Sequence, residues 1–140
     1  MKRTPKSPKT NFKTPLDLSF GYHNIEGIHS SFGCKLPYIH SKFIHDIEVL
    51  SETWGACSHD KNTSGYTLLE KVDPHKNSNI KKGRASGGLL IYCKEKLAKY
   101  ITVIKKTDHY VWLSIDKSIF FNLLKSVKVC VAYKPPDNSK

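Results

Sequence analysis

Two polar residues stand at the ends of apolar runs, and their chemistry suits a divalent cation beside a phosphate. Glu52 follows the run that contains Val49 and Leu50, so its carboxylate is expected where a buried strand meets solvent. Carboxylate oxygens suit Mg²⁺, which keeps several waters and takes one or two carboxylates together with substrate phosphate. Asn24 ends an earlier run, and its amide could donate to a phosphate oxygen. The alternative for each is structural: a strand-end glutamate that pairs with a lysine or caps a turn, and a turn asparagine before Gly27.

A parallel pair of strands would bring these two residues together. Residues 16–22 alternate apolar with polar or small side chains, which predicts a half-buried strand leading to Asn24. Residues 36–45 place apolar side chains on one helical stripe, and residues 46–52 form a second strand. The order strand, helix, strand favours a parallel pairing, which would set Asn24 beside Glu52.

The rest of the chain predicts further strands, at residues 65–72, 87–93, 100–106, 109–116 and 127–133. The third and fourth of these are close enough in sequence to form a hairpin. In the last strand, alternation places Val127, Val129, Val131 and Tyr133 on one face. Trp112 lies within an apolar strand and is expected in the core. The predicted fold class is therefore α/β (α+β), mostly strands with one clear helix.

The length of 140 residues predicts one domain, preceded by a short tail. Residues 1–14 are basic and rich in proline, which predicts a disordered arm before a domain at 15–140. The arm could be a nuclear address or a nucleic-acid-binding arm, and equally a solvated leader. It lacks the apolar stretch of a signal peptide, and no segment approaches the ~20 apolar residues of a membrane span. We therefore expect an intracellular protein, nuclear rather than cytoplasmic.

The chain is strongly basic. Lys and Arg number 23 against 12 Asp and Glu, a formal net charge of +11. Such a charge favours polyanionic partners, and we expect DNA and no membrane. The candidate contacts are Lys81, Lys82 and Arg84, in a long basic loop whose alternative role is simple solvation.

The four cysteines include no Cys-x-x-Cys pair, and an intracellular location predicts reduced thiols. Cys93 and Cys130 lie in apolar runs, where cysteine behaves as a small hydrophobic residue. A zinc site could be imagined from Cys57 and His59 with His40 and His45, but the spacing of zinc ligands is missing. His23, beside Asn24, is the histidine best placed to take part in a site; its alternative is an exposed strand end.

Five segments, in this order, resemble the endonuclease/exonuclease/phosphatase family, and more narrowly the apurinic-endonuclease-like domain of LINE-type (non-LTR) retroelements. They are residues 24–30 (NIEGIHS), 46–54 (DIEVLSETW), 83–92 (GRASGGLLIY), 110–116 (YVWLSID) and 129–136 (VCVAYKPP). The resemblance covers about residues 16–139 and leaves out the basic arm.

The resemblance implies a DNase I-like β-sandwich flanked by helices, and Mg²⁺-dependent cleavage of a phosphodiester bond. It implies that Glu52 is the metal-binding glutamate, Asn24 the active-site asparagine beside it, and Tyr133 the tyrosine that holds the scissile phosphate. A metal bound to phosphate oxygens, with fixed amide and phenol donors, would stabilise the charge of the transition state.

The family's later motifs have no counterpart in this sequence. The family continues with an Asp-x-Asn segment, a further Asp and a terminal Asp-His pair, whereas only the adjacent Asp137 and Asn138 follow Tyr133. We therefore expect an N-terminal portion of the domain, with little or no activity alone. The open half of the sandwich could be covered by a protein partner. The alternative is a non-catalytic basic module that binds nucleic acid or another protein.

Overall fold

The computed structural model describes residues 17–30, 33–54, 62–73, 87–120 and 124–134. Its elements, in chain order, are β1 (Phe20–Asn24), β2 (His29–Ser30), β3 (Gly33–Cys34), α1 (Leu36–Ser41), β4 (Ile47–Ser51), β5 (Tyr66–Val72), β6 (Leu89–Lys94), η1 (Glu95–Tyr100), β7 (Ile101–Lys106), β8 (Tyr110–Ile115), η2 (Lys117–Ile119) and β9 (Val127–Ala132). The fold is mixed α/β, with mostly strands, in three sheets, and few helices.

The first sheet has four strands in the order β1-β4-β6-β5. The predicted parallel pairing of β1 with β4 is confirmed, while β6 runs antiparallel to both β4 and β5. The pairing sets Asn24 opposite Ser51, so Asn24 and Glu52 lie at adjacent strand ends. β4 and β6 are continuously apolar apart from Glu48, Ser51 and the terminal Lys94, as expected for central strands covered on both faces.

Asp46 stabilises the start of the parallel β1–β4 pair. Its carboxylate accepts hydrogen bonds from the backbone N–H of Ser19 (2.9 Å) and from the Ser19 hydroxyl, and pairs with Lys94 at 3.3 Å. Burial opposes ionisation of this carboxyl, but the bonds from Ser19 and Lys94 outweigh it and hold its pKa below the ordinary value. Three strands, β1, β4 and β6, are thereby tied together at one end.

The second large sheet is the antiparallel meander β7-β8-β9, and it includes the predicted hairpin. Alternation along β8 buries Val111, Leu113 and Ile115 and turns the residues between them outward. Val127, Val129 and Val131 share the inward face of β9, as predicted. A two-stranded ladder of β2 with β3 completes the set of sheets.

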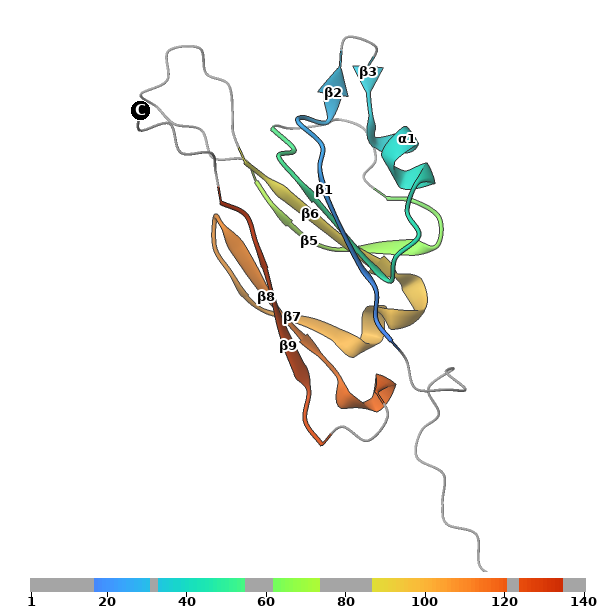
Figure 1. Ribbon diagram of the computed structural model, residues 1–140, viewed down its shortest axis with the longest axis vertical. Coiled ribbons are helices and arrows are strands. Elements are labelled where there is room, and N and C mark those ends of the chain that lie inside the picture. Colours follow the sequence, from blue (N-terminus) through green and yellow to red (C-terminus); the bar gives the residue numbers. More distant parts are fainter. Residues whose placement is uncertain (1–16, 31–32, 55–61, 74–86, 121–123, 135–140) are drawn as a thin grey trace, which may run out of the picture.

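The main core lies between the two large sheets. It is built from inward residues of β4, β6, β8 and β9, together with Leu97 of η1. A second cluster, with Leu36, Phe43 and Tyr92, covers the opposite face of the four-stranded sheet beneath α1. Figure 1 shows α1 on the side of the four-stranded sheet that faces away from β7, β8 and β9.

Several sequence expectations need correction. The first strand is Phe20–Asn24, and residues 17–19 precede it without strand structure. The helix predicted at 36–45 ends at Ser41, and the Ile44 side chain is exposed. The basic arm predicted at residues 1–14 lies outside the described residues.

The outer face of the three-stranded sheet also differs from expectation. Trp112, which the sequence places in the core, is exposed on this outer face. The alternation along β8 points its side chain away from the face on which Leu113 is buried. Cys130 is likewise exposed. Both residues stand between inward-facing neighbours, so an apolar side chain in a β run does not by itself indicate burial.

Within the described ranges the helices are short. α1 has six residues, and no helix is long and apolar enough to cross a membrane.

Cys93 provides a chemical test of the sandwich core. It is fully buried, and burial raises the pKa of its thiol to about 12. Because the thiolate is the reactive form, we expect iodoacetamide at pH 8 to spare Cys93 in the native protein and to modify exposed Cys130. Mass mapping of the alkylated peptides, with and without denaturant, measures this. Equal labelling of both residues in the native protein would contradict the packing between the sheets.

Candidate functional site

The candidate site lies where β1 and β4 end side by side. Backbone pairing continues past the strands, since Ile25 N–H donates to the Ser51 carbonyl (3.0 Å) and Gly27 N–H donates to the Glu52 carbonyl (2.6 Å). Ile28 N–H donates in turn to the Thr53 carbonyl at 3.0 Å. The two loops that leave the sheet are therefore held against each other.

These loops hold unusual backbone conformations. Three non-glycine residues in the described part of the chain have positive φ, and all lie here: Glu26 at 49°, Glu52 at 59° and Trp54 at 64°. Such conformations cost free energy and persist where the surroundings enforce them, and they cluster at functional sites. At Glu52 the left-handed backbone ends the strand and redirects the side chain.

The Glu52 carboxylate connects three separate segments of the chain. Its Oε1 accepts from the Tyr133 hydroxyl, 81 residues away, and from the Gly87 N–H at 3.0 Å. Its Oε2 accepts from the indole Nε1–H of Trp54 at 2.7 Å. Glu52 is 7% exposed, and all three donors are neutral. A buried carboxylate needs such partners, since an unpaired one would be costly.

Tyr133 is held as a hydrogen-bond donor. Burial, then the bond to Glu52, raises the pKa of the phenol well above its ordinary value. The hydroxyl therefore remains protonated at neutral pH and directs its proton to Glu52. Its backbone N–H donates to the His109 carbonyl at 2.8 Å, which continues the sheet past β9.

Asn24 is exposed at the same end of the sheet. Its Oδ1 accepts from the backbone N–H of Glu26 at 3.2 Å, which makes a turn stabilised by the side chain. Among the described contacts, no hydrogen bond joins the Asn24 and Glu52 side chains. The structure thus brings Glu52 and Tyr133 into direct contact and sets Asn24 at the neighbouring strand end.

The basic contacts and the other metal ligands of the expected site are not found beside Glu52 among the described residues. Lys81, Lys82 and Arg84 lie outside the described residues. Glu52 belongs to no group of three or more His, Cys or carboxylate ligands within the described part of the chain. As a cation ligand, Glu52 would thus act with one carboxylate, beside the Asn24 amide and the Tyr133 phenol.

A second polar cluster, which sequence reasoning missed, lies on the opposite face of the same sheet. Glu48 is fully buried, and its carboxylate contacts His23 Nε2 and His45 Nδ1, each at 3.0 Å. Burial opposes its ionisation, but bonds from the His45 backbone and from His23 hold its pKa below the ordinary value. The available signal was the glutamate itself, a charge inside the apolar run of β4.

No protein-family model, curated protein or solved structure matches this chain.

Proposed function

We propose that the chain is the N-terminal portion of a DNase I-like, metal-dependent endonuclease domain related to those of LINE-type retroelements. The observation that carries this proposal is the contact of Glu52 with Tyr133 beside the end of the parallel β1–β4 pair. The family resemblance assigns these two residues and Asn24 to one site, and 81 residues of chain separate the two that touch.

Glu52 would hold the cation, and the residues around it fit one side of such a site. Among the described residues, Oε2 accepts from the Trp54 indole alone, which leaves a lone pair for a hard cation. When bound, Mg²⁺ supplies charge stabilisation for a phosphodiester under attack. Tyr133 carries one hydroxyl proton, which would turn from Glu52 to a phosphate oxygen when substrate binds, and the exposed Asn24 amide would donate from the neighbouring strand end. One carboxylate alone is a weak Mg²⁺ site, so we expect little activity from this chain.

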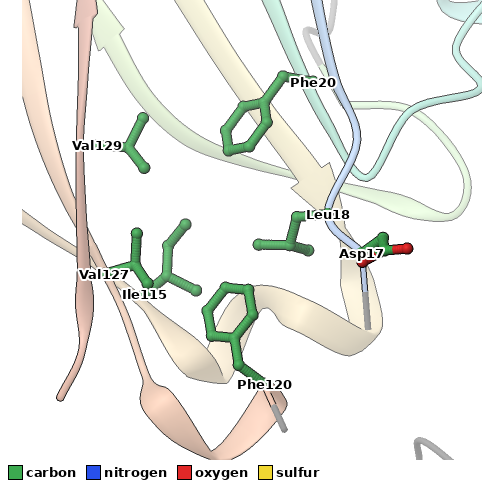
Figure 2. A pocket seen from close by; sticks show the side chains of 7 residues that line it. All are labelled: Asp17, Leu18, Phe20, Ile115, Phe120, Val127 and Val129. Carbon is green, nitrogen blue, oxygen red and sulfur yellow. The ribbon is translucent and has the colours of Figure 1, made fainter. Parts of the chain in front are cut away.

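Two sheet edges that no described strand pairs support the proposal that this is one portion of a larger sandwich. β1 and β9 are edge strands of the two large sheets, and the Tyr22 hydroxyl of β1 reaches the Ala132 carbonyl of β9 at 3.2 Å. Near the first residues of β1 and β9, an apolar cavity of about 310 Å³ opens between these edges (Figure 2). It is lined by Asp17, Leu18, Phe20, Ile115, Phe120, Val127 and Val129. Additional strands there would extend both sheets and cover this surface.

The alternative function is a non-catalytic module that binds nucleic acid or a protein. It is favoured by the three protein donors that bond to the Glu52 carboxylate, since these bonds give the carboxylate a structural role in joining distant segments. The net charge of +11 would then supply salt-sensitive, sequence-independent binding to DNA.

A paramagnetic ion can test the cation site directly. We expect Mn²⁺, used in place of Mg²⁺, to broaden the NMR signal of the Trp54 indole N–H, because this group bonds to Glu52. The Trp112 indole, on the outer face of the other sheet, is the internal reference. Glu52→Gln should abolish the selective broadening, and excess Mg²⁺ should compete with it.

Plasmid nicking distinguishes the two functions in the same preparations. We expect Mg²⁺-dependent nicking close to background, and any nicking above an EDTA control should disappear in Glu52→Gln. Absence of Mn²⁺ broadening, together with salt-sensitive DNA binding that Glu52→Gln leaves unchanged, would overturn the endonuclease proposal in favour of the binding module.

A further inference from the structure

We propose that His23, His45 and Glu48 form a binding site for a borderline divalent metal ion, with Zn²⁺ as the expected occupant. The three ligand atoms come from β1, from the loop after α1 and from β4, and all lie within 4.8 Å of one another. Two imidazoles with one carboxylate are a donor set that suits zinc and neighbouring transition metals, and suits Mg²⁺ poorly.

The sheet register explains why these residues converge. Gly21 pairs with Glu48 across the parallel strands, and His23 lies two residues further along β1 on the same face. A Cβ at Gly21 would overlap Glu48 Oε1 and lie 2.5 Å from His45 Nδ1. The glycine therefore leaves the space in which the three ligand groups meet.

The carboxylate is positioned in advance by the backbone. Glu48 Oε2 accepts from the N–H groups of Ile44 and His45, both at 2.8 Å. Bonds of this kind, to a ligand's own oxygens, fix the orientation of a metal ligand and support its affinity. His45 is held in turn, because its carbonyl accepts from the Tyr66 hydroxyl at 2.8 Å.

The distances between the imidazole nitrogens and the Glu48 carboxylate oxygens suit a shared metal ion as well as a hydrogen bond. Each imidazole nitrogen lies 3.0 Å from a Glu48 oxygen. Ligand atoms around tetrahedral zinc, at bond lengths of about 2.0–2.2 Å, are roughly 3.4 Å apart, so a small outward shift would admit the ion. The side chains of His23 and His45 are 41% and 32% exposed, which leaves a route from solvent and room for a water as fourth ligand.

This site is independent of the proposed endonuclease function. Alternation places His23 and Glu48 on the α1 side of the four-stranded sheet, whereas Glu52 meets Tyr133 of the core between the sheets. The competing arrangement is a metal-free cluster in which both imidazoles simply bond to the buried carboxylate.

The experiment is a Zn²⁺ titration of the full chain against a chromophoric chelator, repeated with Co²⁺ to record the ligand-field absorption of a bound ion. We expect one competing site in the wild type. Loss of one of three protein ligands, in His23→Ala or His45→Ala, should weaken binding at least about tenfold. The matched controls are His29→Ala and His109→Ala, which remove exposed histidines outside the cluster and should keep wild-type affinity within about twofold.

The controls separate this site from binding by other histidines in the chain. If the controls weaken binding as much as His23→Ala and His45→Ala do, or if the wild type takes up no Zn²⁺, the proposal is wrong. Circular dichroism establishes that each variant is folded. Should His45→Ala unfold, His23→Gln, at a side chain 41% exposed, decides the question through its Co²⁺ spectrum. An unchanged spectrum would overturn the proposal.

Discussion

Replacing Glu52 with alanine is expected to lower the free energy of unfolding by about 2–4 kcal/mol. The substitution removes the acceptor of three donors, the Tyr133 hydroxyl, the Gly87 N–H and the Trp54 indole. A buried donor without an acceptor costs more than the bond contributes, because its hydration has already been lost. Urea unfolding followed by far-ultraviolet circular dichroism measures the change.

Two further variants test whether the loss arises from this hydrogen-bonded cluster. Tyr133→Phe removes one donor and should cost about 1 kcal/mol, and Glu52→Ala combined with Tyr133→Phe should cost less than the sum of the two. Glu70→Ala is the matched control, since Glu70 forms an ion pair with a half-exposed lysine, Lys106, and should cost about 0–1 kcal/mol. Equal costs for Glu52→Ala and Glu70→Ala would show that Glu52 does not hold the site together.

Gly27→Ala is expected to cost about 2–4 kcal/mol for two separate reasons. Gly27 has φ of +92°, a left-handed conformation that a side chain disfavours. A Cβ there would also lie 2.6 Å from Cε3 of the Trp54 ring. That ring donates to Glu52, so the overlap would push against the carboxylate cluster. Urea unfolding gives the stability, and the Trp54 indole signal reports any displacement.

Gly65→Ala is the matched control for this substitution. Gly65 has a similar φ, +83°, but a Cβ there would meet nothing within 4 Å. Gly65→Ala should therefore lower the free energy of unfolding only by the cost of the left-handed backbone, about 1–2 kcal/mol. The difference between the two variants measures the packing of Gly27 on Trp54. If the two costs are equal, the close approach of these loops makes no contribution to stability.

These two predictions concern one structural feature, a carboxylate that serves as an acceptor for distant segments. The arrangement explains how Glu52 can occupy a buried strand end: its partners among the described residues are neutral donors and not the lysine that the structural alternative suggested. It also means that a catalytic test must use Glu52→Gln or Tyr133→Phe, because Glu52→Ala would alter the fold together with the chemistry.

The local pattern of the sequence determined much of the secondary structure. Alternation predicted the inward valines of β9, and the short Thr107-Asp108 connection predicted the β7–β8 hairpin. The order strand, helix, strand predicted the parallel β1–β4 pair and hence the neighbouring ends of Asn24 and Glu52. These features are encoded by side-chain periodicity and by the length of short connections, which act within a few residues.

Only the tertiary structure decided which distant groups meet. Periodicity gave no reason for Gly87 to donate to Glu52, and Tyr133 was assigned to this site only by the family resemblance. Glu48 is a charged residue inside the apolar run of β4, and the folded sheet brings His23 and His45 to it. Trp112 became exposed because one face of its sheet lies outside the core. Such contacts depend on strand register and on how the sheets pack, and both are properties of the whole chain.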